Sequence, residues 1–233
     1  MLGIKTKLVE FTKKNLFTQF PFWKLSNDVV IRNLMQHFRA DEYGHQAKKE
    51  KADLGYGWIH YGLSRYLKPS RILCIGSRHG YIPAILAQAC KDNKKGCVDF
   101  VDPGYGQDHK NHWTGTGYWK TKAGKDCFNK FGLGKWIKLY LMTNKRFAKK
   151  YYYYYNYIYI DGDHSYKGVK LDYQLFWSRL KKNGFMSFHD ISITKPQPEG
   201  IYGVHKLWKK ISKKNAIVFP FEGSGLGLLQ KTA

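Results

Sequence analysis

Residues 71–81 read Arg-Ile-Leu-Cys-Ile-Gly-Ser-Arg-His-Gly-Tyr, and helix-forming residues follow as far as Cys90. The apolar run Ile72–Ile75 predicts a short buried strand, and the helical spacing of apolar residues after Tyr81 predicts a helix. Pro83 falls in the first turn of this helix, where its missing N–H group costs nothing. A strand, a glycine turn and a helix start leave backbone N–H groups around a crevice that suits a nucleotide or a carboxylate.

Two glycines and a downstream acid narrow the choice of ligand. Three residues separate Gly76 from Gly80, unlike the Gly-x-Gly-x-x-Gly pattern of dinucleotide-binding enzymes, so a dehydrogenase is disfavoured. A second predicted strand, residues 96–102, ends on Asp102, which lies 22 positions after Gly80. A carboxylate about 20 residues beyond such a turn holds ribose hydroxyls in nucleotide-binding folds. The alternative is that Asp102 only caps the turn at Pro103 and Gly104.

Composition limits the class of protein. The 233 residues suffice for one domain with a full core, with or without an appendage. No run approaches the roughly 20 apolar residues of a membrane span, and no secretion signal is evident. The four cysteines form no Cys-x-x-Cys pair, which favours buried free thiols in a reducing cytoplasm. The net charge of +23 indicates either solvated lysine-rich faces, which we favour, or a basic surface for nucleic acid.

The segments before and after the first two strands differ from the rest. Residues 1–26 mix lysines with aromatic residues, which fits packing on the domain or an amphipathic helix on a membrane or partner. The first 67 residues are predicted to form a helical cap. The aromatic, glycine-rich segment 103–125 is long for a connection and favours a lid over a ligand. Its His109 and His112 lack a third partner nearby and are expected to be ordinary loop residues.

The second half of the chain alternates between strands and helices. The predicted strands are 136–142, 157–160 and 185–190. The predicted helices are 166–182, which residues 182–184 terminate, and 203–211. Strands and helices that alternate at this pace predict parallel crossover connections. Residues 216–221 and 226–229 predict an antiparallel pair at the sheet edge.

Several of these segments resemble one family. Residues 75–81, Ile-Gly-Ser-Arg-His-Gly-Tyr, resemble motif I of class I S-adenosylmethionine-dependent methyltransferases, in the form found in catechol O-methyltransferase-like enzymes. Residues 159–168, Tyr-Ile-Asp-Gly-Asp-His-Ser-Tyr-Lys-Gly, resemble the motif after strand four of bacterial small-molecule and sugar O-methyltransferases. Residues 188–191, the Gly-Val-x-x-Leu-Trp helix and residues 225–229 match the same group. The resemblance covers residues 55–230.

This resemblance implies an α/β fold: a Rossmann-like, doubly wound, seven-stranded sheet, mostly parallel with an antiparallel edge strand, plus the N-terminal helical cap. The chain then divides into a cap, residues 1–67, and a methyltransferase domain, residues 68–233. The resemblance also implies S-adenosylmethionine (SAM) as cofactor. The residues expected to bind it are Gly76, Ser77, His79, Gly80, Tyr81, Asp102 and Asp161.

A metal is the second ligand that the resemblance implies. Metal-dependent relatives bind a divalent ion with an acid after strand four and an acidic pair after strand five. Asp161 and Asp190 match these positions, and His189 takes the place of the first acid of the pair. Magnesium prefers oxygen ligands, whereas manganese, iron or zinc also accept imidazole. Cys74 stands where the family usually has an acid near the amino-acid end of the cofactor.

These features together predict SAM-dependent O-methylation of a small-molecule or saccharide hydroxyl, with or without metal assistance. Methyl transfer from a sulfonium requires the acceptor oxygen to be held near the methyl group and to lose its proton. Asp163 and His164 are the candidates for taking this proton, although Asp163 and Ser165 also fit a helix cap.

Two other functions remain as alternatives. A nucleic-acid methyltransferase would use the basic surface, but the Asn/Asp-Pro-Pro-Tyr/Phe motif of base-flipping enzymes is absent from the sequence. A non-catalytic protein with the same fold is the other. The sequence leaves the acceptor, the metal and the oligomeric state open.

Overall fold

The computed structural model describes residues 28–42, 44–106, 115–198, 200–220 and 223–232. The N-terminal segment 1–26, His109 and His112 lie outside these described residues. None of the helices within them combines the length and the hydropathy needed to cross a membrane.

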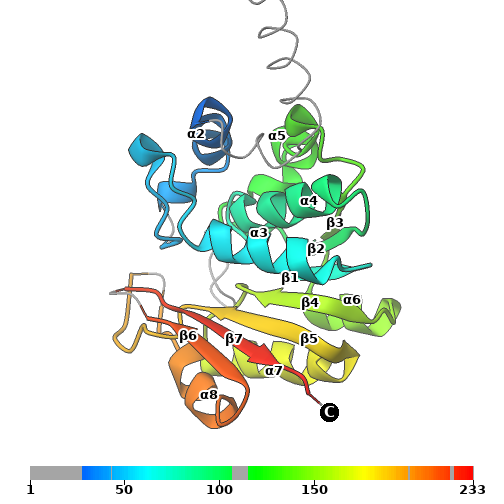
Figure 1. Ribbon diagram of the computed structural model, residues 1–233. Coiled ribbons are helices and arrows are strands. Elements are labelled where there is room, and N and C mark those ends of the chain that lie inside the picture. Colours follow the sequence, from blue (N-terminus) through cyan, green and yellow to red (C-terminus); the bar gives the residue numbers. More distant parts are fainter. Residues whose placement is uncertain (1–27, 43, 107–114, 199, 221–222, 233) are drawn as a thin grey trace, which may run out of the picture.

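One mixed sheet forms the centre of the protein, with strand order β3-β2-β1-β4-β5-β7-β6 (Figure 1). The strands are β1 (Ile72–Ile75), β2 (Val98–Asp102), β3 (Ile137–Leu141), β4 (Tyr155–Ile160), β5 (Leu180–His189), β6 (Ala216–Phe219) and β7 (Leu226–Gln230). Neighbours from β3 to β5 are parallel, whereas β7 is antiparallel to both β5 and β6. The predicted seven-stranded, mostly parallel sheet is confirmed, and its antiparallel edge consists of two strands.

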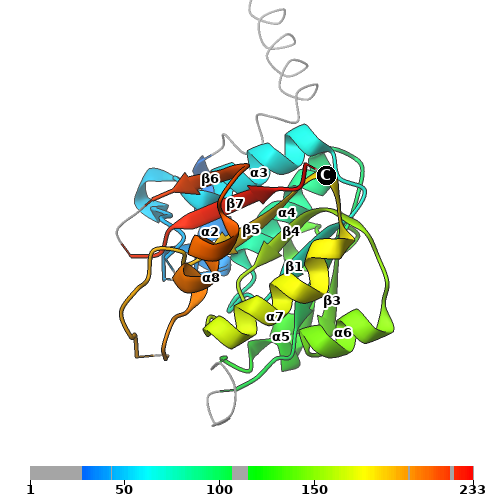
Figure 2. The same ribbon diagram turned by 90° about the horizontal axis from the view of Figure 1, so that it is seen from below.

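Helices cover both faces of this sheet. The α-helices are α2 (Asp28–His37), α3 (Tyr56–Leu67), α4 (Tyr81–Asp92), α5 (Lys122–Asp126), α6 (Asn144–Lys150), α7 (Tyr166–Phe176) and α8 (Val204–Ile211). The 3-10 helices are η2 (Ala40–Glu42), η3 (Lys49–Lys51), η4 (Tyr118–Lys120), η5 (Asn129–Phe131) and η6 (Trp177–Arg179). Figure 2 shows α6, α7 and α8 in front of the sheet, and Figure 1 shows α3 and α4 on its other side.

Side chains of β1 divide between two hydrophobic clusters, one on each face of the sheet. Ile72 and Cys74 pack with α2, α3 and α4, whereas Leu73 and Ile75 pack with α6, α7 and α8. This division follows from the two-residue period of a strand, which sends successive side chains to opposite faces. Because both faces are covered, every residue of β1 is apolar and buried.

The N-terminal helices share the first of these clusters. Leu34 and Met35 of α2 belong to the same cluster of buried residues as Ile85 of α4. The described part of the predicted cap therefore packs directly on the domain, and the boundary at residues 67 and 68 stays a prediction.

The end of the helix after β4 differs from the prediction. The predicted termination at residues 182–184 is wrong, because α7 ends at Phe176 and β5 begins at Leu180. The buried guanidinium of Arg179 donates hydrogen bonds to the backbone carbonyls of Tyr151 (2.6 Å) and Ala148 (2.7 Å), which ties this segment to the end of α6. Residues 182–184 instead lie within β5, where its pairing with β4 shifts register.

Candidate active site

A cavity of about 590 Å³ opens at the carboxyl ends of the parallel strands. It lies at β1 and β4, where the strand order reverses: β2 and β3 lie on one side of β1, and β4 and β5 lie on the other. Such a switch point is where open α/β sheets bind their ligands. Of the predicted site residues, those that line the cavity are Gly76, Ser77, His79, Tyr81, Asp102, Asp161, Asp163, His164, His189 and Asp190. Gly80 is the exception, and Cys74 is buried away from the cavity.

The glycine turn after β1 has the backbone that its sequence predicts. Gly76 has a φ of +73°, and a Cβ atom there would collide with the backbone of Asp161. Gly80 has a φ of +88°, and a Cβ atom there would lie 2.7 Å from the ring of Trp119. Trp119 is buried, and its indole N–H donates to the carbonyl of Ser77 at 2.6 Å. Gly80 therefore makes room for a side chain of the protein.

Asp102 ends β2 at the cavity, and its carboxylate also organises the local backbone. It accepts hydrogen bonds from the N–H groups of Gly104 (2.7 Å) and Ser77 (3.3 Å). Burial raises the pKa of Asp102 to about 6, although these two N–H groups act in the opposite direction. Asp102 thus caps the turn. Each of its two carboxylate oxygens accepts one N–H and keeps a second lone pair for a ligand in the cavity.

His79 and Tyr81 join the glycine turn to the N-terminal helices. Nε2 of His79 lies 3.2 Å from Nη1 of Arg39, and its ring lies 5.1 Å from that of Tyr118. Burial and the neighbouring Arg39 lower the pKa of His79 to about 4. The hydroxyl of Tyr81 donates to the carbonyl of Leu54 at 2.7 Å. Each of these side chains thus has a structural partner. Sequence reasoning missed both, because the partner of His79 lies 40 residues away and that of Tyr81 lies 27 residues away.

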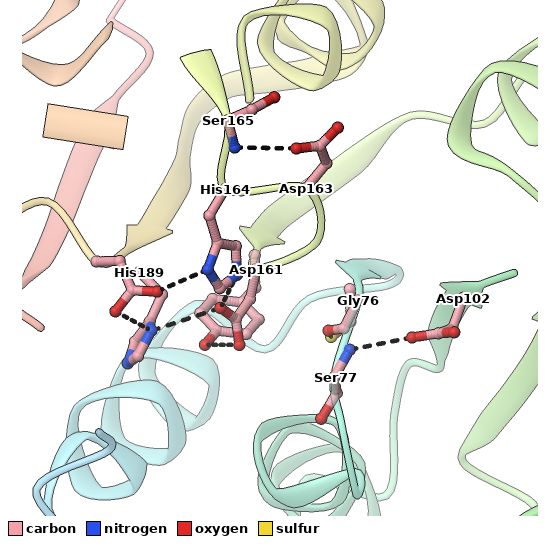
Figure 3. Close-up of polar contacts among 11 residues, drawn as sticks. Gly76, Ser77, Asp102, Asp161, Asp163, His164, Ser165 and His189 are labelled. Carbon is pink, nitrogen blue, oxygen red and sulfur yellow. Dashed lines mark hydrogen bonds and ion pairs between the residues drawn. The ribbon is translucent and has the colours of Figure 1, made fainter. Parts of the chain in front are cut away.

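Two aspartates and two histidines meet after β4 and β5 (Figure 3). Nε2 of His164 lies 3.2 Å from Oδ1 of Asp161, and Nδ1 of the same ring lies 3.0 Å from Oδ2 of Asp190. Nδ1 of His189 lies 3.4 Å from Oδ1 of Asp161 and 3.0 Å from Oδ1 of Asp190. Asp190 has a φ of +62°, a left-handed conformation that Asp adopts more readily than most residues.

Charges within this cluster balance one another. Burial alone would lower the pKa of His164, but Asp190 and Asp161 outweigh it and raise that pKa to about 9. Burial likewise opposes ionisation of Asp190, but His189 and His164 outweigh it and hold the pKa of Asp190 below its usual range. The cluster accordingly pairs two carboxylates with two imidazolium cations in a buried place.

The cluster also offers a fitting set of metal ligands. Asp161, His164 and Asp190 each present a donor atom, and these atoms lie within 4.8 Å of one another. The predicted set had His189 in the place that His164 takes here. His189 contacts both carboxylates, and its Nε2 atom is buried without a hydrogen-bond partner in the described parts of the chain. Two carboxylate oxygens and one imidazole nitrogen suit manganese, iron or zinc better than magnesium.

Two buried residues complete the cluster and were not predicted. The hydroxyl of Tyr159 donates to Oδ2 of Asp161 at 2.9 Å. The ring of His45 lies 4.8 Å from that of His189. Tyr159 had a signal in the sequence, because it lies two residues before Asp161, which directly follows β4, and alternate residues of an extended segment share a face. His45 had none, since it lies in the N-terminal region, far from the strand ends in sequence.

Asp163 lies apart from the cluster, although it lines the same cavity. Figure 3 shows its side chain turned toward Ser165, whose N–H donates to Oδ1 of Asp163 at 2.9 Å. The hydroxyl of Ser165 in turn accepts from the N–H of Gly168 at 3.0 Å and caps α7. The geometry therefore brings His164 to the two carboxylates, and it places Asp163 in the capping arrangement that was the alternative.

Solved structures share this fold at low sequence identity. An O-methyltransferase from Bacillus cereus in complex with SAH is 13% identical, has a TM-score of 0.59 and covers 86% of this chain and 90% of its own. The O-methyltransferase TomG from Streptomyces achromogenes, involved in tomaymycin synthesis and in complex with SAM, is 14% identical, with a TM-score of 0.58 and coverage of 87% and 89%. The SAH-bound methyltransferase PaMTH1 from Podospora anserina is 16% identical, with a TM-score of 0.56 and coverage of 85% and 87%.

Comparison with protein families gives the assignment. A search of curated proteins finds no match. Residues 73–191, which run from β1 to just beyond Asp190, match a family of methyltransferase domains. Because this match spans more than half of the 233 residues, the chain belongs to that methyltransferase family, as its resemblance in sequence predicted.

Proposed function

We propose that this protein transfers a methyl group from SAM to a hydroxyl oxygen of a small molecule or saccharide. The observation that carries the proposal is that one cavity is lined by the glycine turn, by Asp102 and by the cluster around Asp161 and Asp190. A nucleoside cofactor needs the first two, and an acceptor hydroxyl needs the third. The shared fold with O-methyltransferases bound to SAH or SAM supports this choice.

The cofactor lies across β1 and β2 in this proposal. The backbone of Gly76 and Ser77 faces its amino-acid part, and the carboxylate of Asp102 accepts hydrogen bonds from its ribose hydroxyls. The sulfonium methyl group then points toward Asp161, at the end of the neighbouring strand β4. This order follows the order of the strands along the edge of the sheet.

The cluster positions the acceptor and handles its proton. As the acceptor oxygen forms a bond to the methyl carbon, the bond from that carbon to sulfur breaks and the hydroxyl proton leaves. Asp161 and Asp190 accept a hydrogen bond from the hydroxyl, and His164 in its neutral form takes the proton that leaves. The imidazolium group of His189 stabilises negative charge on the acceptor oxygen. A divalent ion held by Asp161, His164 and Asp190 would lower the pKa of the acceptor hydroxyl.

Two matched variants test the proposal. Asp161→Asn and Asp163→Asn make the same change in the same loop, but only Asp161 lies in the cluster. Methyl transfer from SAM to a panel of catechols and saccharides, followed by mass spectrometry, should fall about 100-fold or more in Asp161→Asn and stay near wild type in Asp163→Asn. Calorimetry should show binding of SAH and none of NAD⁺. Binding of NAD⁺ without SAH would overturn the assignment.

Finer expectations accompany this proposal. The free cysteines Cys74, Cys90, Cys97 and Cys127 support a cytoplasmic location. A nucleic-acid acceptor is the less favoured alternative, and salt-sensitive binding of RNA or DNA would support it.

A further inference from the structure

A buried carboxyl group and an amide pair beside the loop that follows β4. Asp172 lies on α7 and is 1% exposed, and Asn144 is the first residue of α6. Nδ2 of Asn144 donates to Oδ1 of Asp172 at 2.6 Å. Oδ2 of Asp172 is buried and has no hydrogen-bond partner among the residues that the structure describes. Both residues line the cavity.

Strand order places this pair relative to the proposed cofactor. The carboxyl ends of β3, β2, β1, β4 and β5 follow one another along the sheet edge. Asn144 comes after β3, Asp102 ends β2, Gly76 follows β1, and the cluster around Asp161 and Asp190 follows β4 and β5. A nucleoside held by its ribose at Asp102, with its reactive end at the cluster, therefore directs its base toward Asn144.

The pair also adjoins the backbone of the loop after β4. A Cβ atom on Gly162 would lie 3.8 Å from Oδ2 of Asp172 and 3.9 Å from Nδ2 of Asn144. Gly162 itself lines the cavity. The pair therefore lies against the loop after β4, in the part of the cavity that Gly162, Asn144 and Asp172 line together.

We propose that Asp172 is a positioning residue that makes the cavity selective for a 6-aminopurine by fixing the amide of Asn144. An asparagine side chain presents a donor at one end and an acceptor at the other. Because Nδ2 is bound to Asp172, Oδ1 of Asn144 is the end that remains for a ligand. This acceptor suits the exocyclic amine of adenine and rejects the carbonyl of a 6-oxopurine. The inference rests on the proposed function, since it requires the nucleoside of SAM in the cavity.

The protonation of Asp172 does not alter this role. Burial raises the pKa of Asp172 to about 7, the bond from Asn144 lowers it, and the nearby carboxylate of Asp163 raises it further. Oδ1 of Asp172 accepts the amide N–H as a carboxylate and also as the carbonyl oxygen of the neutral acid.

A purely structural role for the pair is the competing explanation. Asp172 and Asn144 join α6 to α7, which lie side by side (Figure 2). If that were their whole role, breaking the pair would lower the melting temperature and leave the choice of base unchanged. The choice of base is therefore the quantity to measure.

Calorimetry with SAH and its 6-oxo analogue, S-inosylhomocysteine, separates these explanations. The full-length wild type should bind SAH at least about tenfold more tightly than the analogue. Asp172→Leu removes the acceptor that fixes the Asn144 amide, so this ratio should fall to within a few-fold of unity. In the double variant Asn144→Asp/Asp172→Asn, the new amide donates to the new carboxylate, whose other oxygen faces the base. The ratio should return toward that of the wild type.

Each other outcome has a defined meaning. A wild-type ratio in Asp172→Leu overturns the inference, as does a double variant that discriminates no better than the single one. A wild type that binds both ligands equally overturns the inference and leaves the proposed function intact. A wild type that binds neither overturns the proposed function as well. Melting curves of the two variants show whether each has folded.

Discussion

Removing one hydroxyl group from β4 should weaken the metal site that we propose without disturbing the fold. The hydroxyl of Tyr159 donates to Oδ2 of Asp161 at 2.9 Å, and Tyr159 is completely buried. In Tyr159→Phe the ring still packs against His60, whose ring centroid lies 4.8 Å away. Asp161 would keep its contacts to His164 and His189 but would lose the donor that fixes its other oxygen.

The magnitude follows from the charge on the acceptor. A hydrogen bond to an ionised group contributes about 1.5–3 kcal/mol, and loss of a partner that orients a metal ligand typically costs about 10–100-fold in metal affinity or activity. We therefore expect Tyr159→Phe to weaken Mn²⁺ binding by about 10–100-fold in calorimetry. The kcat/KM for methyl transfer should fall by a similar factor, and the melting temperature should change little.

Tyr157→Phe is the matched control. Tyr157 lies on the same face of the same strand and is also fully buried, but its hydroxyl lies 2.6 Å from Nδ1 of His60. Its removal leaves a buried ring nitrogen unpaired, at a cost of about 1–3 kcal/mol. Each kcal/mol corresponds to about 2–4 °C of melting temperature in a chain of this size. The control should thus lose stability and keep its Mn²⁺ affinity. Equal losses of Mn²⁺ affinity in the two variants would refute the reasoning, as would unchanged affinity in Tyr159→Phe.

Three further predictions follow from the same cavity. Gly80→Val should abolish SAH binding in calorimetry, because the new side chain would combine a φ of +88° with a collision against Trp119; retained affinity would contradict this. Since burial raises the pKa of Asp102 to about 6, its carboxylate becomes protonated as pH falls through that value. SAH affinity should therefore decrease from about pH 7 to about pH 5, and a flat profile would exclude a role for the ionised carboxylate. Metal binding requires neutral His164, whose pKa is raised to about 9, so Mn²⁺ affinity should rise from about pH 7 to about pH 9, by up to about tenfold per pH unit for each proton released.

Much of the fold could be predicted because its signals are local. Ile72–Ile75 and the glycine turn after it lie within ten residues, and the spacing of apolar residues in α4 is read within one helix. The site followed from topology, since the carboxyl ends of parallel strands meet at one edge of the sheet. Asp102, Asp161 and Asp190 each end or follow a strand, and the cavity gathers all three.

Contacts between distant segments could not be predicted in the same way. The ring of Trp119 fills the space beside Gly80, so the pattern of glycines alone could not tell whether a ligand or a side chain lies there. The hydroxyl of Ser224 donates to the carbonyl of Gly44, 180 residues away in the sequence, and both residues line the cavity. No period or motif within one sequence specifies such a pair.

Asp163 and His164 show that the sequence alone could not separate the roles of two adjacent residues. Both are polar, both follow β4, and the sequence offered both as the group that takes the proton. The structure separates them through Gly168, because a Cβ atom there would collide with the carboxyl group of Asp163. With that space open, Asp163 folds back over the first turn of α7 and accepts from the N–H of Ser165. The loop then turns the ring of His164 to the opposite side, between Asp161 and Asp190. The absence of a Cβ atom five residues downstream therefore lets Asp163 fold back over α7, while His164 joins Asp161 and Asp190.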